Sequence, residues 1–168
     1  DDRSGMLNNL GYIGFTYYSK GDYENALLYY EKELEILEEL DDKLLMLFTL
    51  LSYELIYINS GNYDKALEYN TRTLNLFEEV RLNKEYEDLL LEIKVYQFLL
   101  YKYLGREYDS EEIRSLIKLD EYLEDIFFEL NYYIYQVIED KSFLETAYTQ
   151  VQETADNLDS DIKVKFLS

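Results

Sequence analysis

The sequence predicts an all-α chain, an α-solenoid of stacked antiparallel helical hairpins. The first observation is an internal repeat, because the segment GDYENALLYY at 21–30 returns as GNYDKALEYN at 61–70 with a period of 40. The second is the scarcity of helix breakers, since the 168 residues include no Pro and six Gly. A period of this length in a helical pattern is typical of hairpins that each bury an apolar face against the next.

Short turns containing Gly or Asp separate the expected helices. In these turns Asp can also cap the next helix by accepting hydrogen bonds from the free N–H groups of its first turn. The expected helices are 4–20, 23–40, 43–60, 63–80, 84–104, 109–118, 120–139 and 142–158. They form one repeat domain of four units, 4–40, 43–80, 84–118 and 119–158. Residues 159–168 have the pattern of a further helix start, so we expect the chain to be an excerpt of a longer protein.

The first helix carries its apolar residues on one stripe. Leu7, Leu10, Gly14 and Tyr17 are spaced i, i+3, i+7 and i+10, which places them on one side of a helix. We expect Gly14 to lie opposite Ala26, because two small side chains let helices approach closely. One period later the position of Gly14 holds Glu54, a charged residue where a small one is expected.

Composition excludes several classes of protein. The formal net charge of −20 is unfavourable for nucleic acid or an anionic membrane, whose binding requires clustered cations. A hydrophobic content of 48% is too high for a disordered acidic tail. Neither a secretory signal nor a membrane-spanning stretch is evident, so we expect a cytoplasmic location.

The absence of His and Cys restricts the possible chemistry. It removes the commonest general base, the usual nucleophile pairs, and imidazole or thiolate metal ligands. Gly-rich phosphate motifs are also absent. We therefore expect no cofactor, no metal and no enzymatic activity.

With these residues identified, the chain resembles the tetratricopeptide repeat family, in its variant with repeats of about 40 residues and long helices. The matching positions are Gly14, Tyr17, Gly21, Tyr23, Ala26 and Tyr30, then Tyr57, Gly61, Tyr63 and Ala66, then Tyr101, Gly105 and Tyr108. The resemblance implies a right-handed superhelix whose first helices line a concave groove. It also implies binding of peptides or proteins without catalysis.

Transferred by position, the partner-binding groove would be apolar and aromatic with a few amides and hydroxyls. Its residues would be Asn8, Tyr12, Phe15, Ser19, Phe48, Ser52, Leu55, Asn59, Tyr96, Leu99 and Tyr103. One branch of the family holds carboxylate tails with cations in this groove. Those cation positions are occupied here by Gly11, Phe15, Ser52 and Tyr96, which argues against that function.

The sequence thus favours a non-catalytic scaffold for a protein or peptide partner. A partner with basic flanks suits the acidic residues of 24–39, which we otherwise interpret as a solvated outer face. Self-association is left open. An alternative is a sensory or regulatory arm of a larger signalling protein that carries an ATPase, kinase or protease domain.

Two acidic groups suggest other chemistry. Glu121, Glu124, Asp125 and Glu129 share part of a helix face and could serve a carboxylate enzyme only if burial separated their pKa values. Asp156, Asp159 and Asp161 suggest a cation site but lack the ligand spacing of a calcium loop. We interpret both groups as structural.

Overall fold

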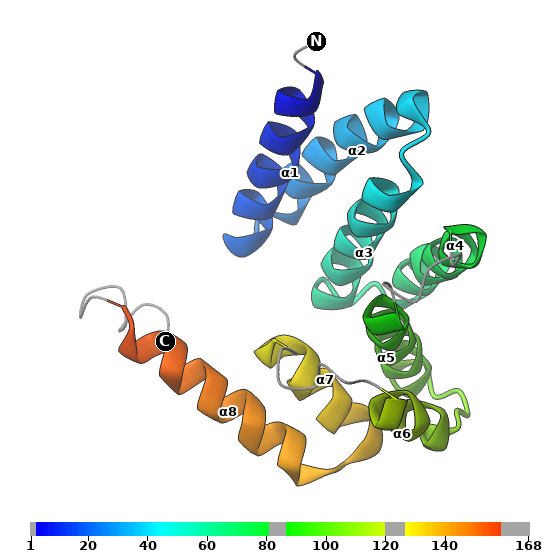
Figure 1. Cartoon of the computed structure of the whole chain (residues 1–168), viewed down its shortest axis with the longest axis vertical. Coiled ribbons are helices and arrows are strands. Elements are labelled where there is room, and N and C mark those ends of the chain that lie inside the picture. Colours follow the sequence, from blue (N-terminus) through cyan, green and yellow to red (C-terminus); the bar gives the residue numbers. More distant parts are fainter. Residues whose placement is uncertain (1–2, 81–86, 120–126, 159–168) are drawn as a thin grey trace. The chain divides into compact units, whose positions relative to one another are not determined.

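The computed structural model describes residues 3–80, 87–119 and 127–158, and these contain helices and turns but no strand (Figure 1). The chain divides into two compact units, 1–86 and 87–168, which we describe separately. The expected helix start at 84–86, residues 120–126 and the further helix at 159–168 lie outside the described residues.

The first unit consists of two helical hairpins. Its helices are α1 (Arg3–Ser19), α2 (Tyr23–Leu40), α3 (Lys43–Asn59) and α4 (Tyr63–Val80). Helix α1 packs on α2 and α3 on α4, while α2 also packs on α3 and so joins the hairpins. The prediction of antiparallel hairpins is confirmed, and each helix end lies within one residue of its expected position.

A glycine ends the first helix of each of these hairpins. The Gly21 backbone has a φ of 73°, a left-handed conformation that glycine adopts without strain. Its N–H donates to the Tyr18 carbonyl at 2.8 Å, and the N–H of Asp22 donates to the Tyr17 carbonyl at 2.9 Å. The Asp22 carboxylate then accepts from the Asn25 N–H at 3.2 Å and caps α2. Gly61 repeats the turn with a φ of 75°.

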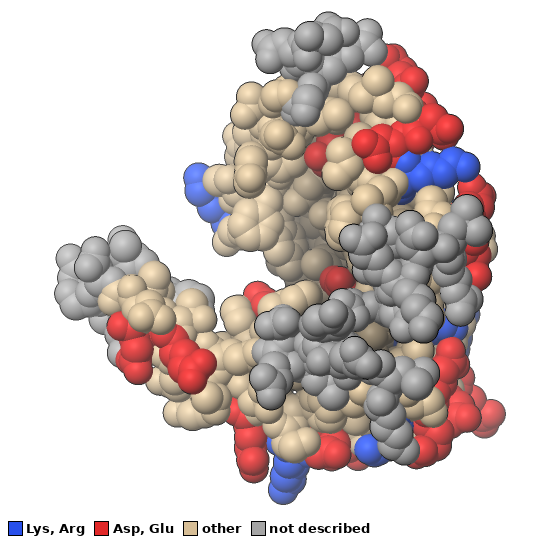
Figure 2. Space-filling view, viewed as in Figure 1, with Lys and Arg blue, Asp and Glu red and all other residues tan. Residues whose placement is uncertain are grey.

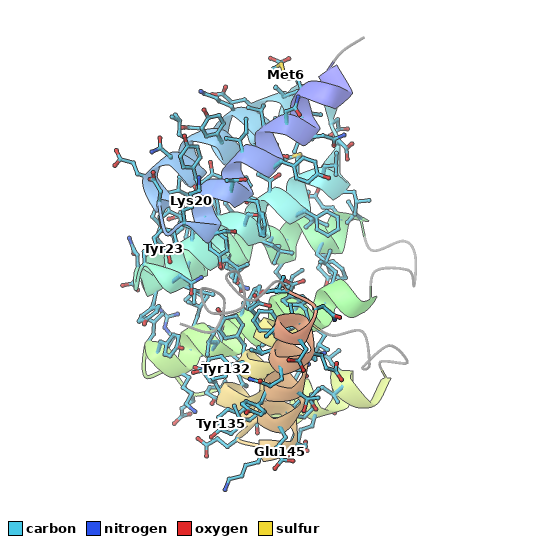
Figure 3. The ribbon with its side chains drawn as sticks, turned by 90° about the vertical axis from the view of Figure 1, so that its left-hand side faces the viewer. Met6, Lys20, Tyr23, Tyr132, Tyr135 and Glu145 are labelled. Carbon is cyan, nitrogen blue, oxygen red and sulfur yellow. The ribbon has the colours of Figure 1, made fainter. Side chains whose placement is uncertain are left out.

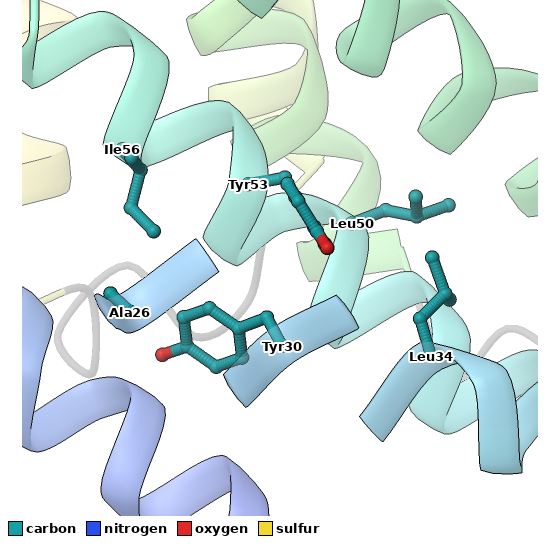
Figure 4. Close-up of a cluster of buried hydrophobic side chains, with 6 residues drawn as sticks. All are labelled: Ala26, Tyr30, Leu34, Leu50, Tyr53 and Ile56. Atoms are coloured by element: carbon teal, nitrogen blue, oxygen red, sulfur yellow. The ribbon is translucent and has the colours of Figure 1, made fainter. Parts of the chain in front are cut away.

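The core of the first unit lies between α2 and α3. It is formed by the buried side chains Ala26, Tyr30, Leu34, Leu50, Tyr53 and Ile56 (Figure 4). The rings of Tyr30 and Tyr53 are 6.3 Å apart, and the Tyr53 hydroxyl donates to the Leu27 carbonyl at 3.4 Å. Because a tyrosine from each helix fills this space, the interface depends on the fit of large rings as well as on aliphatic burial.

The side chain nearest to Gly14 is that of Tyr30. A Cβ added at Gly14 would lie 2.9 Å from the Tyr30 ring, so this ring is what the glycine accommodates. The expected pairing of Gly14 with Ala26 stays a prediction, since Ala26 and Tyr30 are one helical turn apart on α2.

The second hairpin has a polar pair at the equivalent place. Glu54 and Asn70 are one period beyond Gly14 and Tyr30, and both are fully buried. The Asn70 side-chain amide donates to a carboxylate oxygen of Glu54 at 2.7 Å. A shorter partner on α4 thus creates room for the longer side chain on α3, which explains how a carboxylate replaces glycine there.

The second unit contains α5 (Glu87–Tyr103), α6 (Ser110–Leu119), α7 (Phe128–Ile138) and α8 (Lys141–Asp156). Helix α5 packs on α6 and α7, and α7 pairs with α8. The expected helix 120–139 is wrong where it crosses Phe127, because that backbone is extended with a φ of −69° and a ψ of 159°. The single repeat domain expected over the whole chain stays a prediction.

Over the described ranges, none of the helices has the length and the apolar character that crossing a bilayer requires.

Replacing Ala26 with leucine tests the core between α2 and α3. Ala26 has no exposed surface, so three extra carbons must displace the surrounding rings. We expect the free energy of unfolding, measured by urea denaturation, to fall by roughly 1–3 kcal/mol. The control Asn75→Leu, at an exposed position of α4, should leave the curve nearly unchanged. Equal curves for A26L and the parent would contradict the tight packing.

Replacing Gly14 with alanine tests the contact between Gly14 and Tyr30, and with it the register of α1 on α2. Alanine ordinarily stabilises a helix by about 1 kcal/mol over glycine, but here its Cβ would meet the buried Tyr30 ring. We expect a lower melting temperature. At Gly11 the added Cβ would meet only a carboxylate oxygen of Glu33, at 2.7 Å, which can swing away. Gly11→Ala should therefore cost less, and an equal loss in both variants would refute the register.

Candidate partner-binding face

Eight of the predicted groove residues lie on α1 and α3 of the first unit. They are Asn8, Tyr12, Phe15 and Ser19 on α1 and, one period later, Phe48, Ser52, Leu55 and Asn59 on α3. On each helix the spacing of four, three and four residues places the side chains on one stripe. We call these eight residues the uncharged face. Figure 3 shows α1 in front, between the labelled Met6 on α1 and Lys20 just after its end, with α3 beside it.

The aromatic members of the uncharged face are open to solvent. Tyr12 is 73% exposed, Phe15 58% and Phe48 48%. Ser52 and Leu55 are half-buried, so they lie deeper in the same surface. Large exposed rings lose water when they are covered, and such side chains commonly anchor protein interfaces.

Charge is segregated between the helices of the first unit. Residues 5–19 of α1 contain no Asp, Glu, Lys or Arg, and α3 contains only Lys43 and the buried Glu54. The exposed sides of α2 and α4, by contrast, carry most of the charge. The exposed acidic residues there are Glu24, Glu31, Glu35, Glu38, Glu39, Asp64, Glu68, Glu78 and Glu79. In Figure 2 acidic side chains gather where α2 ends, and the surface over α1 is largely free of charge.

Part of the polarity of the uncharged face is used within the fold. The hydroxyls of Ser19 and Ser52 donate to backbone carbonyls of their own helices, at 2.9 and 3.0 Å. The Asn59 amide donates to the Tyr18 hydroxyl at 2.7 Å and links α3 to α1. The exposed Asn8 makes no such bond within the described ranges, so its amide can pair with a partner backbone.

Two side chains of α2 reach in between α1 and α3. The Tyr30 ring packs on Gly14, and one carboxylate oxygen of Glu33 would lie 2.7 Å from a Cβ at Gly11. The Thr49 hydroxyl of α3 donates to the other carboxylate oxygen at 3.3 Å. Glu33 therefore contacts both helices that carry the uncharged face. Its carboxylate lies where α1 and α3 meet, at Gly11 and Thr49, and we call this place the seam.

Burial shapes the ionisation of both side chains. It raises the pKa of the Tyr30 hydroxyl, opposed by a hydrogen bond with Ser52 and reinforced by the Glu33 carboxylate. Burial also raises the pKa of Glu33, against a smaller lowering by the Thr49 hydroxyl. Within the part of the chain that the structure describes, no lysine or arginine pairs with Glu33.

The residues of this seam were missed as site residues in the sequence, although a signal was present. One period after Gly11 and Glu33 the chain has Leu51 and Thr73, which are 4% and 0% exposed. The small residue and the long residue have exchanged helices. A position-by-position comparison of the two repeats shows both differences together: glycine replaces leucine on the first helix and glutamate replaces threonine on the second.

Most other tyrosines of the first unit serve packing. Tyr53 and Tyr69 stack with ring centroids 4.7 Å apart, and Tyr17 stacks on Tyr29 at 5.5 Å. The Arg72 guanidinium lies 5.3 Å from the centre of the Tyr69 ring, close enough for a cation–π interaction. These contacts hold helices together, and they distinguish structural rings from Tyr12, which projects from α1.

Two of the three predicted groove residues of the second unit need correction. Tyr96 and Leu99 have no exposed surface, so neither is open to a partner. The reason is that α5 is apolar on nearly every side and is covered by other helices, as all-round apolar helices usually are. Tyr103 is 39% exposed, and its hydroxyl donates to the Gln136 side chain at 2.7 Å.

The acidic groups noted in the sequence are only partly described. Glu121, Glu124, Asp125, Asp159 and Asp161 lie outside the described residues. Glu129 is exposed on α7 and Asp156 is exposed at the end of α8. Its expected partners are not among the described residues, so the expected acidic face is not tested.

Comparison with protein families matches residues 5–79 to the tetratricopeptide repeat. The match covers both hairpins of the first unit and every residue of the uncharged face. Comparisons with curated proteins and with solved structures gave no match. Repeats of this kind generally mediate protein interactions and are typically non-catalytic. The repeat period, the paired helices and this match agree, and they identify residues 5–79 as a tetratricopeptide repeat region.

Proposed function

We propose that the first unit is a non-catalytic binding module that holds an apolar segment of another protein against its uncharged face. The observation that supports this most directly is the segregation of charge. In a chain with a formal net charge of −20, residues 5–19 carry no charged side chain while α2 is strongly acidic. Solubility alone favours charge on every exposed helix, so an uncharged aromatic stripe is better explained by a partner that covers it.

The exposed rings would supply most of the binding energy. Tyr12, Phe15 and Phe48 each present a large apolar area, and covering one such side chain contributes on the order of 1.5–3 kcal/mol. Rings have few rotatable bonds, so little conformational entropy is lost when they are fixed. The Asn8 amide lies on the same stripe and would orient the bound backbone by hydrogen bonding.

The acidic residues of α2 and α4 would attract a partner electrostatically before it touches the uncharged face. A field of one sign attracts an oppositely charged segment and raises its association rate, an effect that salt weakens. Because the uncharged face itself is free of acidic residues, the field would guide a partner with basic flanks without placing like charges against its apolar centre.

Peptide selection followed by substitution tests this function. Random linear peptides displayed on phage would be selected on the purified chain, and the enriched peptides synthesised for fluorescence anisotropy. We expect Phe15→Asp to weaken binding at least about tenfold, because it places an unpaired charge in the contact. Leu28→Asp, with the same change at a 45% exposed position of α2, is the control. Circular dichroism would verify that both variants keep their helices.

Failure to enrich any peptide, or equal losses for F15D and L28D, would contradict binding at the uncharged face.

Salt dependence tests electrostatic steering. For a selected peptide with basic residues at its ends, raising sodium chloride from about 0.05 to about 0.5 M should lower the association rate constant severalfold. The dissociation rate constant should change less, because the apolar contact is not screened. Stopped-flow fluorescence separates the two constants, and an association rate that is independent of salt would contradict steering by the acidic helices.

A further inference from the structure

We infer that Glu33 is a built receptor for a lysine or arginine side chain of the bound segment, located at the seam between α1 and α3. This inference rests on the proposed function and specifies its ligand: an apolar segment that carries one cationic side chain at its centre. It differs from steering by the outer helices, which acts at a distance and on the flanks of the partner.

The seam is formed by three helices. Glu33 comes from α2, while the small Gly11 of α1 leaves space for one of its carboxylate oxygens. The other oxygen lies 3.3 Å from the Thr49 hydroxyl, which is also 3.1 Å from the Leu45 carbonyl, so Thr49 offers the carboxylate a shared hydrogen bond and no charge. The position of the charge is therefore set by contacts with both helices of the uncharged face.

The carboxylate lies beside the stripe of α1 that carries the uncharged face. It is close to Gly11, which is one helical turn from Asn8 and from Phe15 on the same side of the helix. A lysine or arginine side chain could lay its apolar stem against the exposed rings of the uncharged face while its charged end reaches Glu33. An aromatic ring beside a cation adds a favourable interaction of its own.

The charge of Glu33 is not needed for packing. A half-buried carboxylate with one hydroxyl partner and no cation is costly, because desolvation opposes its ionised form. The same chain contains the alternative, since the equivalent positions of the second hairpin hold Leu51 and Thr73, which are both buried and carry no charge.

A cation from outside would supply what the seam lacks. A hydrogen bond to a charged group contributes about 1.5–3 kcal/mol when it is shielded from water. A bound lysine or arginine would form an ion pair with the carboxylate and offset the cost of its burial. The ionised carboxylate would therefore be more stable in the complex than in the free protein. A neutral residue at the same position of the segment would instead cover the carboxylate and leave it unpaired.

The test uses the peptides selected on the intact chain. Each lysine or arginine of the best peptide is replaced in turn by norleucine or citrulline, which remove the charge and keep most of the shape. Each peptide is then measured against the parent chain, Glu33→Gln and the matched control Glu35→Gln. Glu35 is exposed on the same helix, so both variants lose one negative charge.

We expect one central cation whose removal weakens binding to the parent chain roughly tenfold or more. For Glu33→Gln the charged and neutral peptides should bind almost equally, whereas Glu35→Gln should still distinguish them. This double-mutant cycle isolates the contact between the two groups from the field of the whole protein. The melting temperature of the free Glu33→Gln chain should not fall. If Glu33 had a purely structural role, the melting temperature would fall.

Other results would overturn the inference. If the enriched peptides carry no central cation, or if Glu33→Gln and Glu35→Gln weaken binding equally, the uncharged face binds but Glu33 is not its cation site. If F15D does not impair binding, the proposed function fails as well. The two failures are thus distinguished by different variants.

Discussion

The structure of the first unit depends on the close approach of α2 to α1 at two glycines. Gly14 accommodates the Tyr30 ring and Gly11 accommodates the Glu33 carboxylate, so α2 sits deep against its partner helix. From that depth Tyr30 also reaches Tyr53 of α3 and Glu33 reaches Thr49. One helix thus sets the distance between its two neighbours, and the spacing of the uncharged face follows from it.

The two hairpins solve the same packing problem in different ways. Where the first places glycine against tyrosine, the second places Glu54 against Asn70 with a hydrogen bond of 2.7 Å. Where the first has glycine and glutamate, the second has Leu51 and Thr73. Both solutions conserve space across the interface. They differ in charge, since the carboxylate of the second hairpin has an amide partner within the core and that of the first lies at the edge of an exposed surface.

The separation of charge links folding to recognition. The acidic residues of α2 and α4 lie outside the core, where water screens them and where they oppose aggregation. They therefore allow α1 to expose rings that would otherwise be a liability in solution. On the proposed function, a surface that is apolar at its centre and acidic at its borders would select segments that are apolar at their centre and basic at their ends, and a carboxylate at the seam would refine that selection to a single position.

The sequence by itself determined the helices and their turns in the first unit, because these depend on local properties. Glycine at 21 and 61 adopts a left-handed backbone, Asp22 and Asp42 cap the following helices, and the apolar spacing defines the buried side. Position 41 ends a helix in the same left-handed conformation without glycine. The stripe from Asn8 to Asn59 was obtained by transferring positions from the tetratricopeptide repeat family that the sequence resembles.

Only the tertiary structure decided which residues face each other across helices. The partner of Gly14 depended on a register that the turn sets in three dimensions, and Glu33 acquired its position from Gly11 and Thr49, which are distant in sequence. Tyr96 and Leu99 share the spacing of the exposed stripe, yet they are buried because α5 is covered on more than one side. Spacing along one helix shows which side chains share a face, but burial depends on what the rest of the chain packs against that face.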